Sequence, residues 1–144
     1  MIGLRYLLAF LLPASVYLGL LSHGTLSFAA LIFAFGLVPF FEGILPTAAS
    51  NLTDSERSKV LSQSHYDFFV LMQIPLHMGA IALFIAVVPQ DRSSGDMVSL
   101  IGHMTALGIS CGTLAINVAH ELGHRPQAAY QRLAQGLLVS SLYG

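Results

Sequence analysis

The sequence predicts an all-α integral membrane protein: four transmembrane helices, then a cytoplasmic histidine box and an amphipathic helix. Hydrophobic residues make up 55% of the 144 residues and charged residues only 9%, against about 25% charged in ordinary soluble domains. The mean hydropathy is +0.73. A soluble fold of this length cannot bury so much apolar surface, which excludes a soluble enzyme and a disordered chain. Six Lys and Arg with a net charge of −1 exclude a basic nucleic-acid-binding protein.

Four apolar segments are candidates to cross a bilayer, whose hydrocarbon core needs about 20 helical residues. They are residues 4–21, 26–41, 68–88 and 97–118. The last three contain no charged residue, and the second is short but long enough when its flanks are added. The first could be a signal peptide, but no clear small-residue cleavage site precedes a polar segment, so we favour a membrane anchor.

The connections between these spans carry the polar residues. A minimal turn over residues 23–25 joins the first two spans, and residues 42–65 form the one long polar connection. In that connection Thr53 and Glu56 have capping-box spacing, which predicts a short helix near Asp54. Residues 89–96 are expected to be a short turn. On the fourth span Gly108 and Gly112 predict close packing among the spans, with a homodimer face as the alternative.

The distribution of Lys and Arg predicts the orientation. With the N-terminus in the cytoplasm, five of the six basic residues lie inside and only Arg92 lies outside. This asymmetry agrees with the positive-inside rule. The inside residues are Arg5, Arg57, Lys59, Arg125 and Arg132.

The pattern changes after the fourth span. Pro126 disfavours helix at Arg125 and suits the first turn of a new helix. Apolar residues then recur at helical spacing, which predicts an amphipathic helix at the membrane interface, or alternatively the start of a fifth span. They are Ala129, Tyr130, Leu133, Leu137 and Leu138.

A histidine pair carries the chemistry. His120 and His124 are four residues apart, about 40° and 6 Å along a helix, so both rings lie on one side and can bind one metal ion. In a zinc metalloprotease with this His-Glu-x-x-His spacing, Glu121 is the general base. In a membrane non-haem iron oxygenase, Glu121 instead lies beside the ligands. The composition does not choose between them.

The other histidines lie at different depths along the predicted spans. His103 is about 26 Å from His120 along the helix, so it cannot share the metal and should be packed or face water. His77 should sit near the middle of the third span, where it pairs with Gln73 or marks a substrate path. His65, at the start of that span, is the remaining histidine that could approach the pair.

The segment His120-Glu121-Leu122-Gly123-His124-Arg125 resembles the first histidine box of the membrane-bound alkane 1-monooxygenase family, within the fatty-acid desaturase/hydroxylase superfamily. That box reads His-Glu-Leu-x-His-Lys. Residues 131–144 resemble the family's approach to its second box. Arg125 replaces the usual Lys, which keeps the charge but changes the donor geometry.

The resemblance implies a membrane monooxygenase that hydroxylates the terminal carbon of alkanes or alkyl chains with O₂. It implies two iron ions, electrons from rubredoxin and rubredoxin reductase, and a place in the bacterial inner membrane. His120 and His124 would be iron ligands, and Glu121 would orient a ligand. The second and third boxes are missing, so residues 1–144 read as the N-terminal portion of one oxygenase domain, inactive alone.

Three alternatives remain open at this point. A fatty-acid desaturase or hydroxylase is the nearest relative of the favoured function. An intramembrane zinc metalloprotease would use the same box for zinc. A non-catalytic membrane module would carry the histidine pair by chance.

Overall fold

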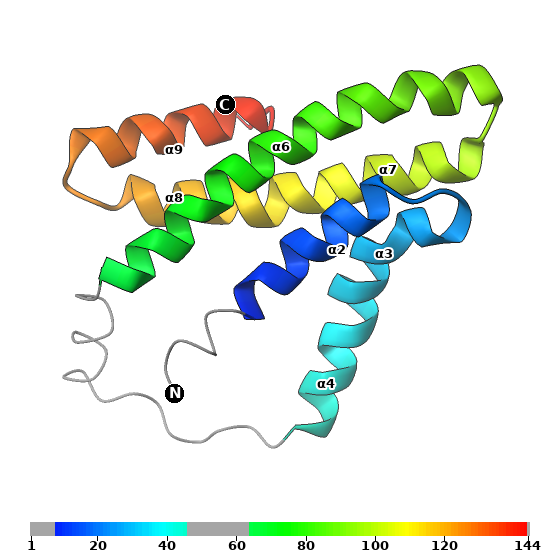
Figure 1. Cartoon of the computed structure of the whole chain (residues 1–144). Helices are drawn as coiled ribbons and strands as arrows, with labels where there is room; N and C mark the ends of the chain where they lie inside the picture. Colours follow the sequence, from blue (N-terminus) through cyan, green and yellow to red (C-terminus); the bar gives the residue numbers. More distant parts are fainter. Residues whose placement is uncertain (1–7, 46–63, 144) are drawn as a thin grey trace.

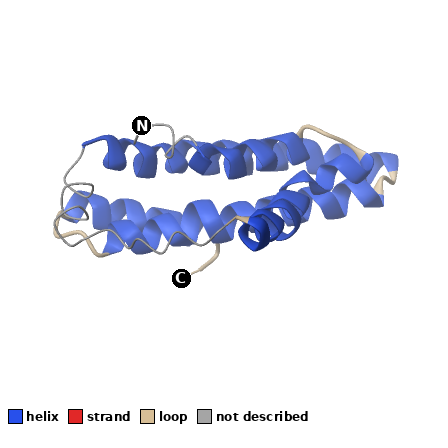
Figure 2. Cartoon of the chain, turned by 90° about the horizontal axis from the view of Figure 1, so that it is seen from below, coloured by secondary structure: helices blue, strands red, loops and turns tan. Residues whose placement is uncertain are grey.

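The structure, a computed structural model, describes residues 8–45 and 64–143, and all regular structure within these ranges is helical (Figures 1 and 2). The N-terminal half contains η1 (Leu8–Phe10), α2 (Leu11–Leu20), η2 (Gly24–Phe28), α3 (Ala29–Ile32), η3 (Phe33–Leu37) and α4 (Val38–Ile44). The C-terminal half contains α6 (Ser64–Ser94), α7 (Met97–Ser110), η4 (Cys111–Ile116), α8 (Asn117–Gly123) and α9 (Ala128–Ser140).

Among the residues that the structure describes, three helical stretches are long and apolar enough to cross a membrane. They are Gly24–Ile44, Asp67–Ser94 and Met97–Gly123, which match the predicted spans 26–41, 68–88 and 97–118. The predicted span 4–21 is described only as a shorter apolar helix, Leu8–Leu20, because residues 1–7 lie outside the described ranges. The all-α class is therefore confirmed, while the count of four spans and their orientation stay predictions. The helix predicted near Asp54 also lies outside the described residues.

The turn predicted over residues 89–96 is wrong for most of its length. Helix α6 continues through Pro89 to Ser94, and only two residues separate it from α7. Side-chain hydroxyls near the helix end donate to nearby helix carbonyls: Ser93 Oγ to Gln90 O (2.9 Å) and Ser94 Oγ to Asp91 O (3.1 Å).

The third membrane-length stretch changes its winding in the middle. Its segment η4 is a π-helix, which has more residues per turn than an α-helix. In an α-helix, each residue is rotated by about 40° around the helix axis from the residue four positions before it. The π segment reverses part of this rotation. Gly108, Gly112, Ile116 and His120 therefore stay closer to one side of the helix. The apolar pattern of the sequence contains no signal for this change.

Two apolar clusters hold the helices together. One joins α2, α3, α6 and α7, and the other joins η4, α8 and α9 with the first turns of α6. The first contains Val16, Leu20, Ala30, Ala80 and Ala106. The second contains Ala115, Val118, Ala119, Leu122, Ala134 and Leu137, with Val70, Leu71 and Ile74 packed against it. Helix α4 has no buried residue and diverges from the other helices (Figures 1 and 2).

Helix α9 confirms the predicted helix after Pro126, but not its place at the interface. It folds back alongside α8 (Figure 1). At its end, Ser140 Oγ lies 3.2 Å from His77 Nε2. His77 itself is about 15 Å further along α6 than Asp67. This direction fits the alternative, the start of a further span. The packed face is also shifted: Ala134 and Leu137 are buried, while Ala129 and Leu133 are exposed.

The close-packing role predicted for Gly108 and Gly112 is wrong. A Cβ atom on either glycine would meet nothing within 4 Å. Close approach occurs earlier on the same helix, where a Cβ on Gly102 would overlap the Ser27 side chain and lie 2.9 Å from the Ser27 carbonyl carbon. The four-residue spacing identified small residues correctly, but it could not show which of them face a neighbouring helix.

We expect Gly102→Ala to lower the free energy of unfolding by about 1–3 kcal/mol, because the added methyl group has no space. Gly108→Ala is the matched control on the same helix α7. It adds the same methyl group over open space, so it should be neutral or stabilising by up to about 1 kcal/mol. Thermal unfolding in detergent measures both changes. Equal effects of the two substitutions would contradict the packing at Gly102.

Candidate metal centre

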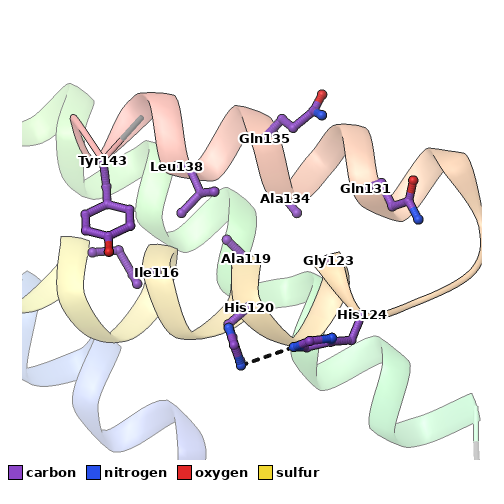
Figure 3. A pocket seen from close by; sticks show the side chains of 10 residues that line it. All are labelled: Ile116, Ala119, His120, Gly123, His124, Gln131, Ala134, Gln135, Leu138 and Tyr143. Carbon is purple, nitrogen blue, oxygen red and sulfur yellow. Dashed lines mark hydrogen bonds between the residues drawn. The ribbon is translucent and has the colours of Figure 1, made fainter.

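The predicted histidine pair lies together at the end of the third membrane-length stretch. His120 is in the last turn of α8, and His124 follows directly after that helix. Their Nε2 atoms are 3.3 Å apart, and their ring centroids are 4.6 Å apart (Figure 3). Both side chains are exposed. The four-residue spacing therefore brings the two rings to one side, as the sequence predicts.

This geometry fits two ligands of a single ion. With metal–nitrogen bonds of about 2.0–2.1 Å, neighbouring ligands at roughly 90–110° have nitrogens about 2.8–3.4 Å apart. The observed 3.3 Å falls in that range. Within residues 8–45 and 64–143, no group of three or more His, Cys, Asp or Glu side chains is placed to hold a metal. The pair can supply part of a metal site, and a two-iron centre needs further ligands.

The pair borders a cavity of about 540 Å³ between α8 and α9 (Figure 3). Helix α9 contributes two polar residues to its wall, Gln131 and Gln135. Beyond α9, Leu142 has a φ of 59°, and the chain then places Tyr143 at the same cavity. The sequence did not predict that Gln131, Gln135 and Tyr143 line this cavity. The two glutamines could have been noticed, because they are four residues apart on the polar side of a predicted helix. The remaining lining residues are Ile116, Ala119, Gly123, Ala134 and Leu138.

Arg125 connects the end of the histidine box to the start of α6. Its Nη1 donates to Asp67 Oδ1 at 2.7 Å, and its Nη2 lies 3.5 Å from Glu121 Oε1. Burial lowers the pKa of the Arg125 guanidinium, but the hydrogen bond and charge of Asp67 and the charge of Glu121 outweigh it and raise the pKa. The guanidinium also lies 5.0 Å from the Tyr130 ring centroid. These contacts use the forked donor geometry that Lys lacks.

His77 is fully buried but does not pair with Gln73. Ser140 Oγ donates to the Leu137 carbonyl (2.7 Å), so it accepts from His77 Nε2 (3.2 Å). Ser110 Oγ then donates to Nδ1 (2.9 Å). The neutral ring thus joins α6, α7 and α9, and the predicted pairing with Gln73 is wrong because both ring nitrogens already have partners.

His103 lies at the opposite end of the bundle from the pair, as its sequence position implies. Its Nδ1 is 2.6 Å from Asp91 Oδ2, and its Nε2 donates to the Ser22 carbonyl at 2.8 Å. The side chains of His103 and Asp91 are 0% and 1% exposed. Of the two predicted environments, packed or facing water, the structure shows the packed one. The sequence did not reveal Asp91 as the partner, because that residue was assigned to a turn. The side chain of His65 lies outside what the structure describes.

Two curated proteins resemble the chain. It is 27% identical over 144 residues to alkane 1-monooxygenase 1 of Alcanivorax borkumensis, an alignment that covers 96% of this chain and 35% of that protein. It is 28% identical over 109 residues to alkane 1-monooxygenase 2 of Pseudomonas aeruginosa, covering 75% of this chain and 28% of that protein. The chain thus spans about a third of the length of these relatives. No family model and no solved structure matches it.

Proposed function

We propose that the chain is the N-terminal portion of a membrane non-haem di-iron monooxygenase. The complete protein would hydroxylate the terminal carbon of alkanes or alkyl chains with O₂. The observation that carries the proposal is the pair of imidazole nitrogens, 3.3 Å apart, at the end of an apolar helix of membrane length. The distant similarity to two alkane 1-monooxygenases supports it.

In this proposal His120 and His124 supply two of the iron ligands, and the other ligands come from residues outside the described chain. Bound iron would supply the activation of O₂ that attack on an unactivated C–H bond requires. Glu121 and Arg125 hold the end of α8 against Asp67, and in this proposal they position the backbone that carries both histidines. A carboxylate beside a ligating histidine commonly has such an orienting role.

The proposed partners and location rest on the family resemblance and on the predicted orientation. An alkyl substrate dissolves in the bilayer and can reach the protein between its helices. Rubredoxin and rubredoxin reductase, both soluble, would deliver electrons at the cytoplasmic edge, where the histidine box would lie in the orientation that the positive-inside rule predicts. The membrane would be the bacterial inner membrane.

We expect a cysteine at Gln127 to be protected, and a cysteine at Ser93 to be labelled, when an impermeant thiol reagent is added outside the cell. Both positions are exposed, and they lie beyond opposite ends of the stretch Met97–Gly123. The native Cys111 is first replaced by Ala. Labelling of Gln127→Cys from outside, with protection of Ser93→Cys, would refute the cytoplasmic location of the box.

Turnover of octane by the complete gene product tests the proposed function. With rubredoxin and its reductase supplied, we expect 1-octanol and the consumption of O₂. The 144-residue chain alone should hold less than one iron and form no octanol, because two histidines are too few for two irons. Unsaturated products from acyl chains would support a desaturase instead, and zinc-dependent cleavage of a membrane peptide would support a metalloprotease.

A further inference from the structure

The amide of Gln73 has a buried oxygen without a partner. Its Nε2 donates to the Phe69 carbonyl at 3.3 Å. Because a carbonyl can only accept, this contact identifies the nitrogen and leaves Oε1 as the free acceptor. Gln73 is 7% exposed, and its Oε1 has no hydrogen-bond partner among the described residues and almost no contact with solvent. Such an acceptor, inside a membrane-length helix, is costly unless a donor reaches it.

Gln73 lines a cavity of about 340 Å³ between the η1–α2 segment, α6 and the η4–α8 segment. The wall is mostly apolar and includes Leu12, Val70, Leu114 and Val118. At one end it reaches Asn117, which lies one helical turn before His120. The cavity is therefore next to the candidate metal centre.

A second apolar hollow lies beside the cavity along the same helix. It has a volume of about 400 Å³ and shares Thr113 with the first. Its floor is the surface over Gly108 and Gly112, which is open because neither glycine approaches another helix. The Thr113 hydroxyl donates to the Ile109 carbonyl at 2.5 Å, so it leaves no free donor for Gln73. Together the two hollows span about 20 Å of helix from Thr105 to Val118.

We propose that these two neighbouring hollows together bind a primary alcohol of medium chain length. Its alkyl chain lies over Gly108 and Gly112, and its hydroxyl donates a hydrogen bond to Gln73 Oε1 after a small rotation of the amide. An alkane occupies the same space but has no donor, so Gln73 favours the hydroxylated chain. The inference rests on the proposed function only in naming this alcohol as the reaction product.

Binding of labelled 1-decanol and decane to the detergent-solubilised chain, measured by equilibrium dialysis, tests the proposal. We expect Gln73→Leu to weaken 1-decanol binding by about 3- to 10-fold, the effect of one lost hydrogen bond. Decane binding should be unchanged. Methyl decyl ether, which has no donor, should also bind equally to wild type and Gln73→Leu.

Gln90→Leu is the matched control, because Gln90 makes the same contact to the carbonyl four residues earlier on α6 (3.3 Å) but is exposed. It should change none of the three affinities. A second variant, Gly112→Leu, fills the hollow and should weaken all three ligands together. Unchanged 1-decanol affinity in Gln73→Leu, or equal loss for 1-decanol and decane, would overturn the proposal. The assay needs neither iron nor turnover, so its failure is distinct from failure of the proposed hydroxylation.

Discussion

Alanine at His120 or at His124 should nearly abolish both the iron content and the octane hydroxylation of the complete protein. Each substitution removes one of two nitrogens that lie 3.3 Å apart and that are free to face a shared ion. In the described part of the chain, no group of three or more His, Cys, Asp or Glu side chains is placed to hold a metal. The effect of a single substitution should therefore be close to that of the double variant.

Glu121→Gln separates the proposed roles inside the box. The side chain lies 3.5 Å from Arg125 and is about two-fifths exposed, so an amide keeps its size and part of its hydrogen bonding. If Glu121 orients a ligand, this variant should keep much of its iron and lose activity by about 10- to 100-fold. Complete loss of activity with full metal content would instead indicate that Glu121 transfers a proton, as it would in a metalloprotease.

Replacing His103 by Leu should lower the free energy of unfolding by about 3–5 kcal/mol, the effect of leaving a buried carboxylate without its partner. Asp91 is 1% exposed, and its Oδ2 lies 2.6 Å from His103 Nδ1. Thermal and denaturant unfolding in detergent would measure the loss. His103→Leu with Asp91→Leu should recover much of the stability, because the double change removes the unpaired charge as well.

His23→Leu provides the control for this buried pair. The ring of His23 lies near the same carboxylate, with Nδ1 at 3.9 Å from Asp91 Oδ1, but its side chain is 69% exposed. Its removal should change the stability by no more than about 1 kcal/mol, as for an exposed ion pair. If His103→Leu were as mild as His23→Leu, the pair would not hold this end of the bundle together.

The sequence predicts those parts of the fold that depend on composition and spacing. Long segments without charge predicted the three membrane-length helices, because a bilayer tolerates few charges. The spacing of His120 and His124 predicted two neighbouring rings, because helix geometry alone brings them together. Both predictions are local, and each depends on one helix at a time.

Features that depend on contacts between helices could not be predicted in this way. Residues 89–96 were expected to form a turn, whereas the helix continues to Ser94 and places Asp91 beside His103. Gly108 and Gly112 have the spacing of packed small residues, but they border a hollow. The unpartnered Gln73 oxygen could not be found either, because the sequence shows neither burial nor the absence of a donor.

The source of the oxygen atom in the product is the most direct test of the proposed function. The complete protein, supplied with rubredoxin and its reductase, would be incubated with octane under ¹⁸O₂ in ordinary water, and the octanol analysed by mass spectrometry. A monooxygenase should place one ¹⁸O atom in 1-octanol, and the His120→Ala variant should form none. Unlabelled octanol, or no octanol from an iron-loaded wild-type protein, would contradict the assignment.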